Sequence, residues 1–191
     1  KFGEIASVEY RALGIATALS PQIDLATEPR WSRFDGTMGE DPDLAADMAR
    51  AYVDGFQTSE GEAHISGGWG YHSVNAMVKH WPGGGPEEGG RDGHYAFGAY
   101  AVYPGNNLTD HLKPFTEGAF KLQGPTGMAS AVMPYYTISF NQDTKNGENV
   151  GNAYNKYLIT DLLRGTYKYD GVVCTDWGVT GDVTGVDRFE G

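Results

Sequence analysis

Four short apolar segments recur along the chain, and none of them shows the alternation of polar and apolar residues that is typical of a half-exposed strand. They are "GIATALS" at 14–20, "NAMVKH" at 75–80, "MASAVMP" at 128–134 and "GVVCTD" at 171–176. Apolar runs of this length are typical of parallel strands. The pattern therefore predicts four parallel strands that are covered on both faces.

Segments with helical periodicity separate these strands, and the first of them, 41–57, has clear start signals. It opens with Asp41 at the N-cap position and Pro42 at the first helical position, where both residue types are favoured. Apolar residues then recur at helical spacing, at Leu44, Met48, Ala51, Tyr52 and Phe56. We expect this set to form the buried face of the helix.

Two later segments also predict helices. The segment 109–122 is interrupted by Pro114 and Gly118, whereas 152–167 is strongly amphipathic throughout. A helix is also compatible with the residues that precede the first strand. The predicted order is therefore βαβαβαβ.

This alternation predicts a parallel sheet with right-handed crossovers, in either a doubly wound fold or a (β/α) barrel of TIM type. The segments that follow strand ends are long and rich in Gly, Trp and charge, which favours the barrel, where functional loops gather at the C-terminal ends of the strands. A complete barrel needs about 250 residues and eight strands. We therefore expect residues 1–191 to form a partial barrel domain with about four β/α units, as a fragment of a longer multi-domain enzyme.

Polar and aromatic residues stand at the ends of three predicted strands. They are Lys79 and His80 after the second strand, Tyr135 and Tyr136 after the third, and Asp176 and Trp177 after the fourth. Each has an ordinary structural explanation when taken alone, such as a helix cap for the aspartate. Because the strand ends of one barrel converge, together they predict one pocket.

Such a pocket suits a sugar, because aromatic faces with fixed donors and acceptors at their rim match the apolar faces and hydroxyl edge of a pyranose. Asp176, kept ionised by nearby Lys and Arg side chains, would be placed to attack an anomeric carbon. The aromatic ring of Trp177 would form a wall of the same pocket.

Composition narrows the possible partners. The net charge is −11 at pH 7, and no apolar run approaches the roughly 20 residues that span a bilayer. Nucleic acids and anionic membranes require clustered Lys and Arg, so neither is an expected partner. The expected substrate is a small neutral or cationic molecule.

Motifs for cofactors and metals are weak. The run "WPGGGPEEGG" lacks the ending of a P-loop and the spacing of a dinucleotide fingerprint, so no cofactor is predicted, and its glycines are expected to let the backbone bend close to a ligand. Asp92 and His94 provide only a weak zinc hypothesis. Carboxylates that lie in loops where calcium could bind lack EF-hand spacing: Asp24, Glu40, Asp41, Asp143 and Glu148. No metal site is predicted.

Four motifs in order resemble a known family. They are "EPRWSRFDGTMGEDP", "VKHWPGGGPEEGGRDGH", "ASAVMPYY" and "YDGVVCTDWG", and they are similar to the N-terminal barrel of glycoside hydrolase family 3, which includes β-glucosidases and β-xylosidases. The resemblance covers nearly the whole chain. It implies a retaining, exo-acting β-glycosidase of β-glucosidase type that acts on a small carbohydrate and works in the periplasm or outside the cell.

The resemblance also assigns roles to single residues. It implies that Asp176 is the nucleophile that forms the covalent glycosyl-enzyme and that Trp177 lines the subsite for the terminal sugar. It implies sugar contacts for Arg33, Lys79, His80, Arg91 and Tyr136, with Tyr135 as second choice for the last.

The second catalytic group is the open question. In β-glucosidases of the family it usually comes from a second domain, which implies further polypeptide that also completes the barrel. In the β-N-acetylglucosaminidase branch it is an Asp–His pair, which Asp92 and His94 imitate. A sugar-binding module without catalysis is the alternative from another functional class, because such a module would keep the pocket.

Overall fold

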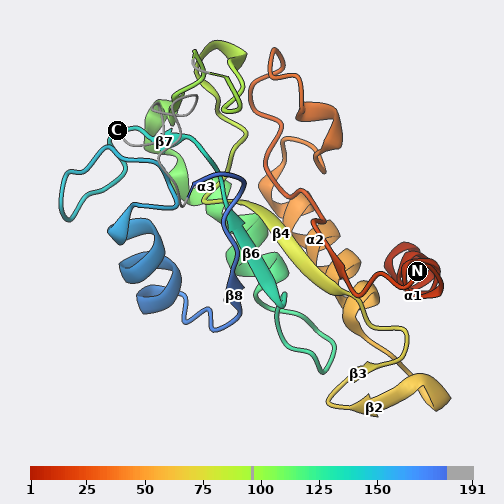
Figure 1. The fold of residues 1–191 in the computed structure, drawn as a ribbon. Helices are drawn as coiled ribbons and strands as arrows, with labels where there is room; N and C mark the ends of the chain where they lie inside the picture. Colours follow the sequence, from red (N-terminus) through yellow and green to blue (C-terminus); the bar gives the residue numbers. More distant parts are fainter. Residues whose placement is uncertain (96, 180–191) are drawn as a thin grey trace.

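Four strands lie side by side in one parallel sheet in the computed structural model, which describes residues 1–95 and 97–179 (Figure 1). They follow the order of the sequence: β1 (Thr17–Ala18), β4 (Asn75–Trp81), β6 (Ala131–Pro134) and β8 (Val172–Val173). The prediction of four adjacent parallel strands is confirmed, and with the covering helices the sheet is part of an α/β barrel. The end of the predicted domain, 180–191, lies outside the described residues.

Each predicted strand contains an observed one, but the outer strands are shorter than predicted. β4 has partners on both sides, Asn75 with Thr17 and Met77 with Ala131, and is the longest. Within the described residues β1 and β8 each pair with one neighbour, so fewer of their residues are held in a ladder. Gly14, predicted as the first strand residue, instead has a φ of 79° in the turn after the first helix.

The helix α2 (Pro42–Gln57) begins as predicted. One carboxylate oxygen of Asp41 accepts hydrogen bonds from the backbone N–H groups of Asp43 and Leu44, at 2.9 and 2.8 Å. These bonds satisfy two donors that have no partner inside the helix.

The predicted buried face of α2 is correct at Phe56, which is fully buried, but wrong at Leu44 and Met48. Leu44 and Met48 are 54% and 45% exposed, whereas the buried residues include the small side chains Ala45, Ala46 and Ala49. Small residues here let the helix pack closely on its neighbour, since a Cβ atom on Gly118 would stand 2.6 Å from the carbonyl oxygen of Ala46. Close backbone packing, not side-chain size, decides which face is buried.

The other helices match their predicted segments in part. α1 (Phe2–Ala12) precedes β1, and the segment 109–122 contains α3 (Leu108–Lys113) followed directly by the wider turns of η5 (Pro114–Ala119). Pro114 does not end this helix but begins its second part. η6 (Tyr157–Thr166), the blue helix in Figure 1, occupies the C-terminal part of the segment 152–167. No helix among the described residues is both long and apolar enough to cross a membrane.

Short elements mark the two ends of the sheet. The hairpin of β2 (His64–Ser66) and β3 (Trp69–Gly70) lies where β4 begins, and the parallel pair of β5 (Tyr100–Ala101) and β7 (Ile138–Ser139) lies at the opposite end, among the loops that follow the strands (Figure 1). Four 3-10 turns complete the elements: η1 (Phe34–Gly36), η2 (Gly61–Ala63), η3 (Glu88–Gly90) and η4 (Pro104–Asn106). The β5–β7 pair thus connects the loop after β4 with the loop after β6 at the C-terminal ends of the strands.

Candidate active site

A pocket of about 350 Å³ opens at the C-terminal ends of the strands. Its lining residues are Leu19, Arg33, Lys79, His80, His94, Met133, Tyr136, Asp176 and Trp177. The structure therefore brings together seven of the residues that the sequence singled out, from loops and strand ends up to about 150 positions apart.

The backbone of the sheet places the main polar groups. Lys79 and His80 lie near the C-terminal end of strand β4, whereas Tyr136 and Asp176 lie just past the ends of β6 and β8. The N–H of Trp177 donates to the hydroxyl oxygen of Tyr136 at 3.0 Å, which ties two strand ends together. The Trp177 side chain stays 64% exposed at the pocket and is available to a ligand.

Two cations face the pocket. The Arg33 guanidinium lies 6.0 and 5.9 Å from the ring centres of Trp31 and Tyr135, and its buried Nη1 has no hydrogen-bond partner among the described residues. Burial and then the like charge of Arg33 lower the pKa of Lys79, whereas Asp176 acts in the opposite direction. Donors that lack a protein partner beside a carboxylate are suited to bind the hydroxyls of a ligand.

On the side away from the pocket, the His80 ring contacts Asp24, which the sequence indicated only as a loop carboxylate. Both side chains are buried, and Nδ1 of His80 lies 2.7 Å from Oδ2 of Asp24. The signal in the sequence is a carboxylate between two apolar residues, Ile23 and Leu25, immediately after a strand. Only the fold shows that its partner lies 56 residues further along the chain.

The pair of Asp92 and His94 forms, but only His94 lines the pocket. Its Nδ1 lies 2.5 Å from Oδ1 of Asp92, and the indole N–H of Trp31 donates to the other oxygen of Asp92 at 2.7 Å. Although burial alone would raise the pKa of Asp92, the hydrogen bonds from His94 and Trp31 hold it below its usual value. Asp92 is thus an ionised partner behind His94.

Arg91 does not line the pocket, contrary to the position expected for a sugar contact. Its side chain is 56% exposed, and Nη1 lies 3.5 Å from a carboxylate oxygen of Glu88. The loop turns at Gly90, with a φ of 75°, and packs against Arg30 so closely that a Cβ atom would stand 2.6 Å from the Cβ of Arg30. Arg91 instead pairs with Glu88 on its own loop.

The glycine run after β4 packs closely against the protein itself. A Cβ atom on Gly85 would stand 1.8 Å from the carbonyl oxygen of Leu25, and one on Gly84 would stand 2.8 Å from the ring of Tyr135. The run therefore lets the loop approach the segment that carries Asp24. It supports the site from behind.

Glu87, on the same loop, is a buried carboxyl group without a partner. It is 1% exposed, and neither of its oxygens makes a hydrogen bond within the described part of the chain. Burial, followed by the negative charges of Asp92 and Asp24, raises its pKa well above 4.5, while the nearby hydroxyl of Tyr135 acts weakly in the opposite direction. We therefore expect Glu87 to keep its proton to a higher pH in the folded protein than in the unfolded chain.

This expectation gives a measurable pH dependence. Above 4.5 the unfolded chain releases the proton that folded Glu87 keeps, so the free energy of unfolding should fall by up to about 1.4 kcal/mol per pH unit until the raised pKa is passed. Glu87→Gln keeps the shape and should remove this decline. Urea unfolding of the wild type, of Glu87→Gln and of the exposed neighbour control Glu88→Gln, at about pH 5 and about pH 8, tests it. Equal pH dependence in all three proteins would contradict it.

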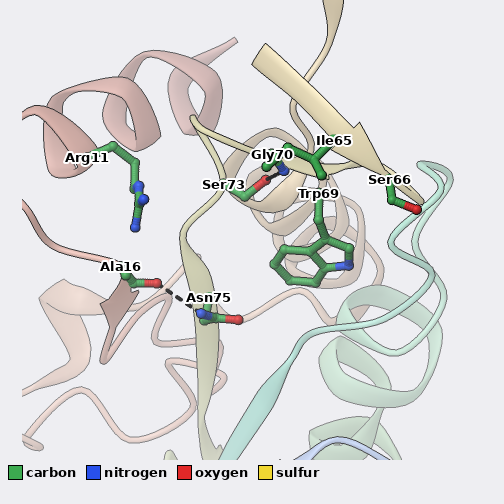
Figure 2. Close-up of a pocket in the computed structure, with 8 residues that line it drawn as sticks. All are labelled: Arg11, Ala16, Ile65, Ser66, Trp69, Gly70, Ser73 and Asn75. Atoms are coloured by element: carbon green, nitrogen blue, oxygen red, sulfur yellow. Dashed lines mark hydrogen bonds between the residues drawn. The ribbon is translucent and has the colours of Figure 1, made fainter.

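A second pocket, of about 260 Å³, lies at the other end of the sheet, where β4 begins (Figure 2). Figure 2 shows that Arg11 and the ring of Trp69 line this pocket. The side-chain amide of Asn75 donates a hydrogen bond to the carbonyl oxygen of Ala16 at 3.0 Å. No carboxylate or histidine is part of its lining. In barrel enzymes the chemistry takes place at the opposite, C-terminal end of the strands. The first pocket is therefore the candidate active site.

A metal site has no support from side-chain clusters. Within 1–95 and 97–179, no group of three or more His, Cys, Asp and Glu side chains is arranged to hold a metal ion.

Comparison with known sequences gives matches over nearly the whole chain. The family described as "Glycosyl hydrolase family 3 N terminal domain" matches residues 1–189. The chain is 48% identical over 187 residues to the periplasmic beta-glucosidase/beta-xylosidase of Dickeya chrysanthemi, covering 97% of this chain and 27% of that protein. It is 44% identical over 182 residues to beta-glucosidase C of Emericella nidulans, covering 95% and 27%.

A solved structure matches the fold. The beta-glucosidase from Listeria innocua in complex with glucose aligns with a TM-score of 0.73 and 26% identity, over 92% of this chain and 21% of that one. The chain thus spans only about a quarter of the length of these two curated relatives.

Proposed function

Because the chain belongs to glycosyl hydrolase family 3, we propose that the protein is a retaining, exo-acting β-glycosidase of β-glucosidase type. The observation that carries this proposal is the convergence of Asp176 with two cations and Trp177 in one pocket of about 350 Å³. A carboxylate beside donors and an aromatic wall suits a terminal sugar residue.

In the proposed reaction Asp176 attacks the anomeric carbon. A bond forms between its oxygen and that carbon, the glycosidic bond breaks, and the leaving oxygen takes a proton from an acid. Water then attacks the same carbon, gives up a proton and frees the carboxylate. Arg33, Lys79, His80 and Tyr136 would hold the sugar hydroxyls while Trp177 covers one face of the ring.

The acid that protonates the leaving oxygen is proposed to come from further polypeptide, which would also complete the barrel. The relatives are about four times longer than the chain, and apolar side chains such as Leu13 (78% exposed) and Val172 (63%) are uncovered in the described part. The name of the Dickeya relative supports a periplasmic or extracellular location.

A β-N-acetylglucosaminidase is the second candidate, because the pair of Asp92 and His94 is formed and His94 reaches the pocket. In that case His94 would be the acid. A sugar-binding module without turnover would use the same pocket but form no covalent bond.

Trapping with a 2-deoxy-2-fluoro-β-glucoside that carries an activated leaving group tests the proposal. The fluorine slows the second step, so the covalent intermediate accumulates. We expect intact-mass analysis of the full-length protein to show one added fluoroglucosyl group, which peptide mapping locates on Asp176. Binding of glucose without any adduct would favour the sugar-binding module, and an adduct on another residue would refute the assignment of the nucleophile.

A further inference from the structure

Asp24 sits immediately behind the pocket, where the chain after β1 runs beside β4. The N–H of Ile23 donates to the carbonyl oxygen of Lys79 at 2.8 Å, so the next residue, Asp24, reaches His80. Its Oδ1 accepts from the backbone N–H groups of His80 at 2.9 Å and Gly84 at 2.6 Å. Its Oδ2 faces Nδ1 of the His80 ring at 2.7 Å.

These contacts fix which ring nitrogen carries the proton. Although burial would raise the pKa of Asp24, its hydrogen bonds with His80 and Gly84 lower it, so the carboxylate is ionised and can only accept. Nδ1 must therefore be the donor. Burial lowers the pKa of His80, and the positive charges of Arg33 and Lys79 lower it further, whereas the negative charge of Asp24 raises it. Because the net effect lowers the pKa, the ring holds only the proton on Nδ1.

The other ring nitrogen, Nε2, is then an acceptor. His80 lines the pocket, and within the described residues no hydrogen bond to its Nε2 is formed. The ring cannot turn freely, because it packs at 4.4 Å against the ring of Tyr135, centre to centre. The pocket thus offers donors on Lys79 and Arg33 and a lone pair on His80.

We infer that Asp24 is a positioning residue, which holds His80 as a hydrogen-bond acceptor for one sugar hydroxyl in the pocket. The use of this acceptor for a sugar rests on the proposed function. A hydroxyl fits such a site because it can accept from Lys79 or Arg33 and donate to His80 at the same time. A fluorine in its place can accept but cannot donate.

The variant Asp24→Asn separates positioning from folding. Two backbone N–H groups require an oxygen at the Oδ1 position, so the amide NH₂ must stand at the Oδ2 position and donate to Nδ1. The histidine is then forced into the opposite tautomer, with its proton on Nε2. Asp143→Asn is the matched control, because Asp143 is also buried and accepts from backbone N–H groups, but it does not line the pocket.

Two measurements on the full-length protein test the inference. Neutron diffraction of the wild type should show hydrogen on Nδ1 of His80 and none on Nε2, and of Asp24→Asn the reverse. With an aryl β-glucoside, Asp24→Asn should lower kcat/KM by about 10- to 100-fold, and Asp143→Asn by less than about threefold. The 3-, 4- and 6-fluoro analogues of this substrate are tested next, and in one of them fluorine replaces the contacted hydroxyl. With that analogue, the ratio of the wild-type kcat/KM to the Asp24→Asn kcat/KM should be at least about fivefold smaller than with the parent substrate, because Nε2–H in the variant can donate to fluorine.

Hydrogen on Nε2 of wild-type His80 would overturn the inference, and this result needs no variant to fold. An equal loss of activity in Asp24→Asn with the parent substrate and all three fluoro analogues would reduce Asp24 to a structural role. A wild-type protein that does not hydrolyse any of these glucosides would refute the proposed function, whereas the neutron result would still decide the tautomer.

Discussion

The variant Asp176→Asn is expected to lower kcat for aryl β-glucosides by at least about a thousandfold, because the amide keeps the shape of the side chain but cannot form the covalent intermediate. KM for the sugar should change little, since the contacts of Lys79 and Arg33 remain. Steady-state kinetics on the full-length protein measures both values. The control is Asp170→Asn, an exposed aspartate at the other end of β8, which should behave like wild type.

The smaller variant Asp176→Gly adds a chemical test of the same assignment. With the carboxylate removed, azide has room to attack the anomeric carbon from the side that Asp176 occupied. We expect azide to restore turnover and to give the α-glucosyl azide, which is the product of a single displacement. Activity of Asp176→Asn within about tenfold of wild type, or a β-azide product, would contradict the role of Asp176 as the nucleophile.

The position of the site could be predicted because it follows from topology. Once the apolar runs are taken as parallel strands in sequence order, their C-terminal ends must lie together, and so must Lys79, Tyr136 and Asp176. No knowledge of side-chain packing is needed for this step. The N-cap of α2 could be predicted for a different reason, because Asp41 acts only on its immediate neighbours in the sequence.

What could not be predicted depends on contacts between distant segments. The buried face of α2 is set by close packing against Gly118, so Leu44 and Met48 point outward although they have the right spacing. Arg91 has the expected distance in sequence from His80, but it does not line the pocket and pairs with Glu88 instead. Nothing in the residues around Asp24 shows that His80 will be its partner.

Contacts between distant segments also determine the protonation of the buried carboxyl groups behind the pocket. Asp24, Glu87 and Asp92 all lie near Tyr135, yet within the described residues only the side chains of the two aspartates accept hydrogen bonds. Burial and then the negative charges of Asp92 and Asp24 make it costly for Glu87 to ionise as well. The protonation of each group is thus a property of the cluster, and composition or local sequence does not determine it.

Lys79 is expected to give the second-largest loss. Lys79→Met keeps most of the aliphatic stem but removes the ammonium group, which in the proposed site binds sugar hydroxyls. Loss of a hydrogen bond from a charged donor costs about 1.5–3 kcal/mol, which corresponds to a fall in kcat/KM of roughly 10- to 150-fold. The exposed Lys156, changed to Met, is the matched control and should leave kcat/KM within about twofold.

The pH–rate profile distinguishes the charge of Lys79 from simple loss of a contact. A positive charge near Asp176 favours the carboxylate form, and the electrostatic coupling between the two groups is present in the structure. The acid limb of kcat/KM is therefore compared between the wild type and Lys79→Met, and movement of this limb in the variant would show that the charge of Lys79 acts on the nucleophile. Arg33 remains in place and limits the size of the shift. A lower kcat/KM with an unmoved acid limb would mean that Lys79 binds the sugar without acting on the nucleophile.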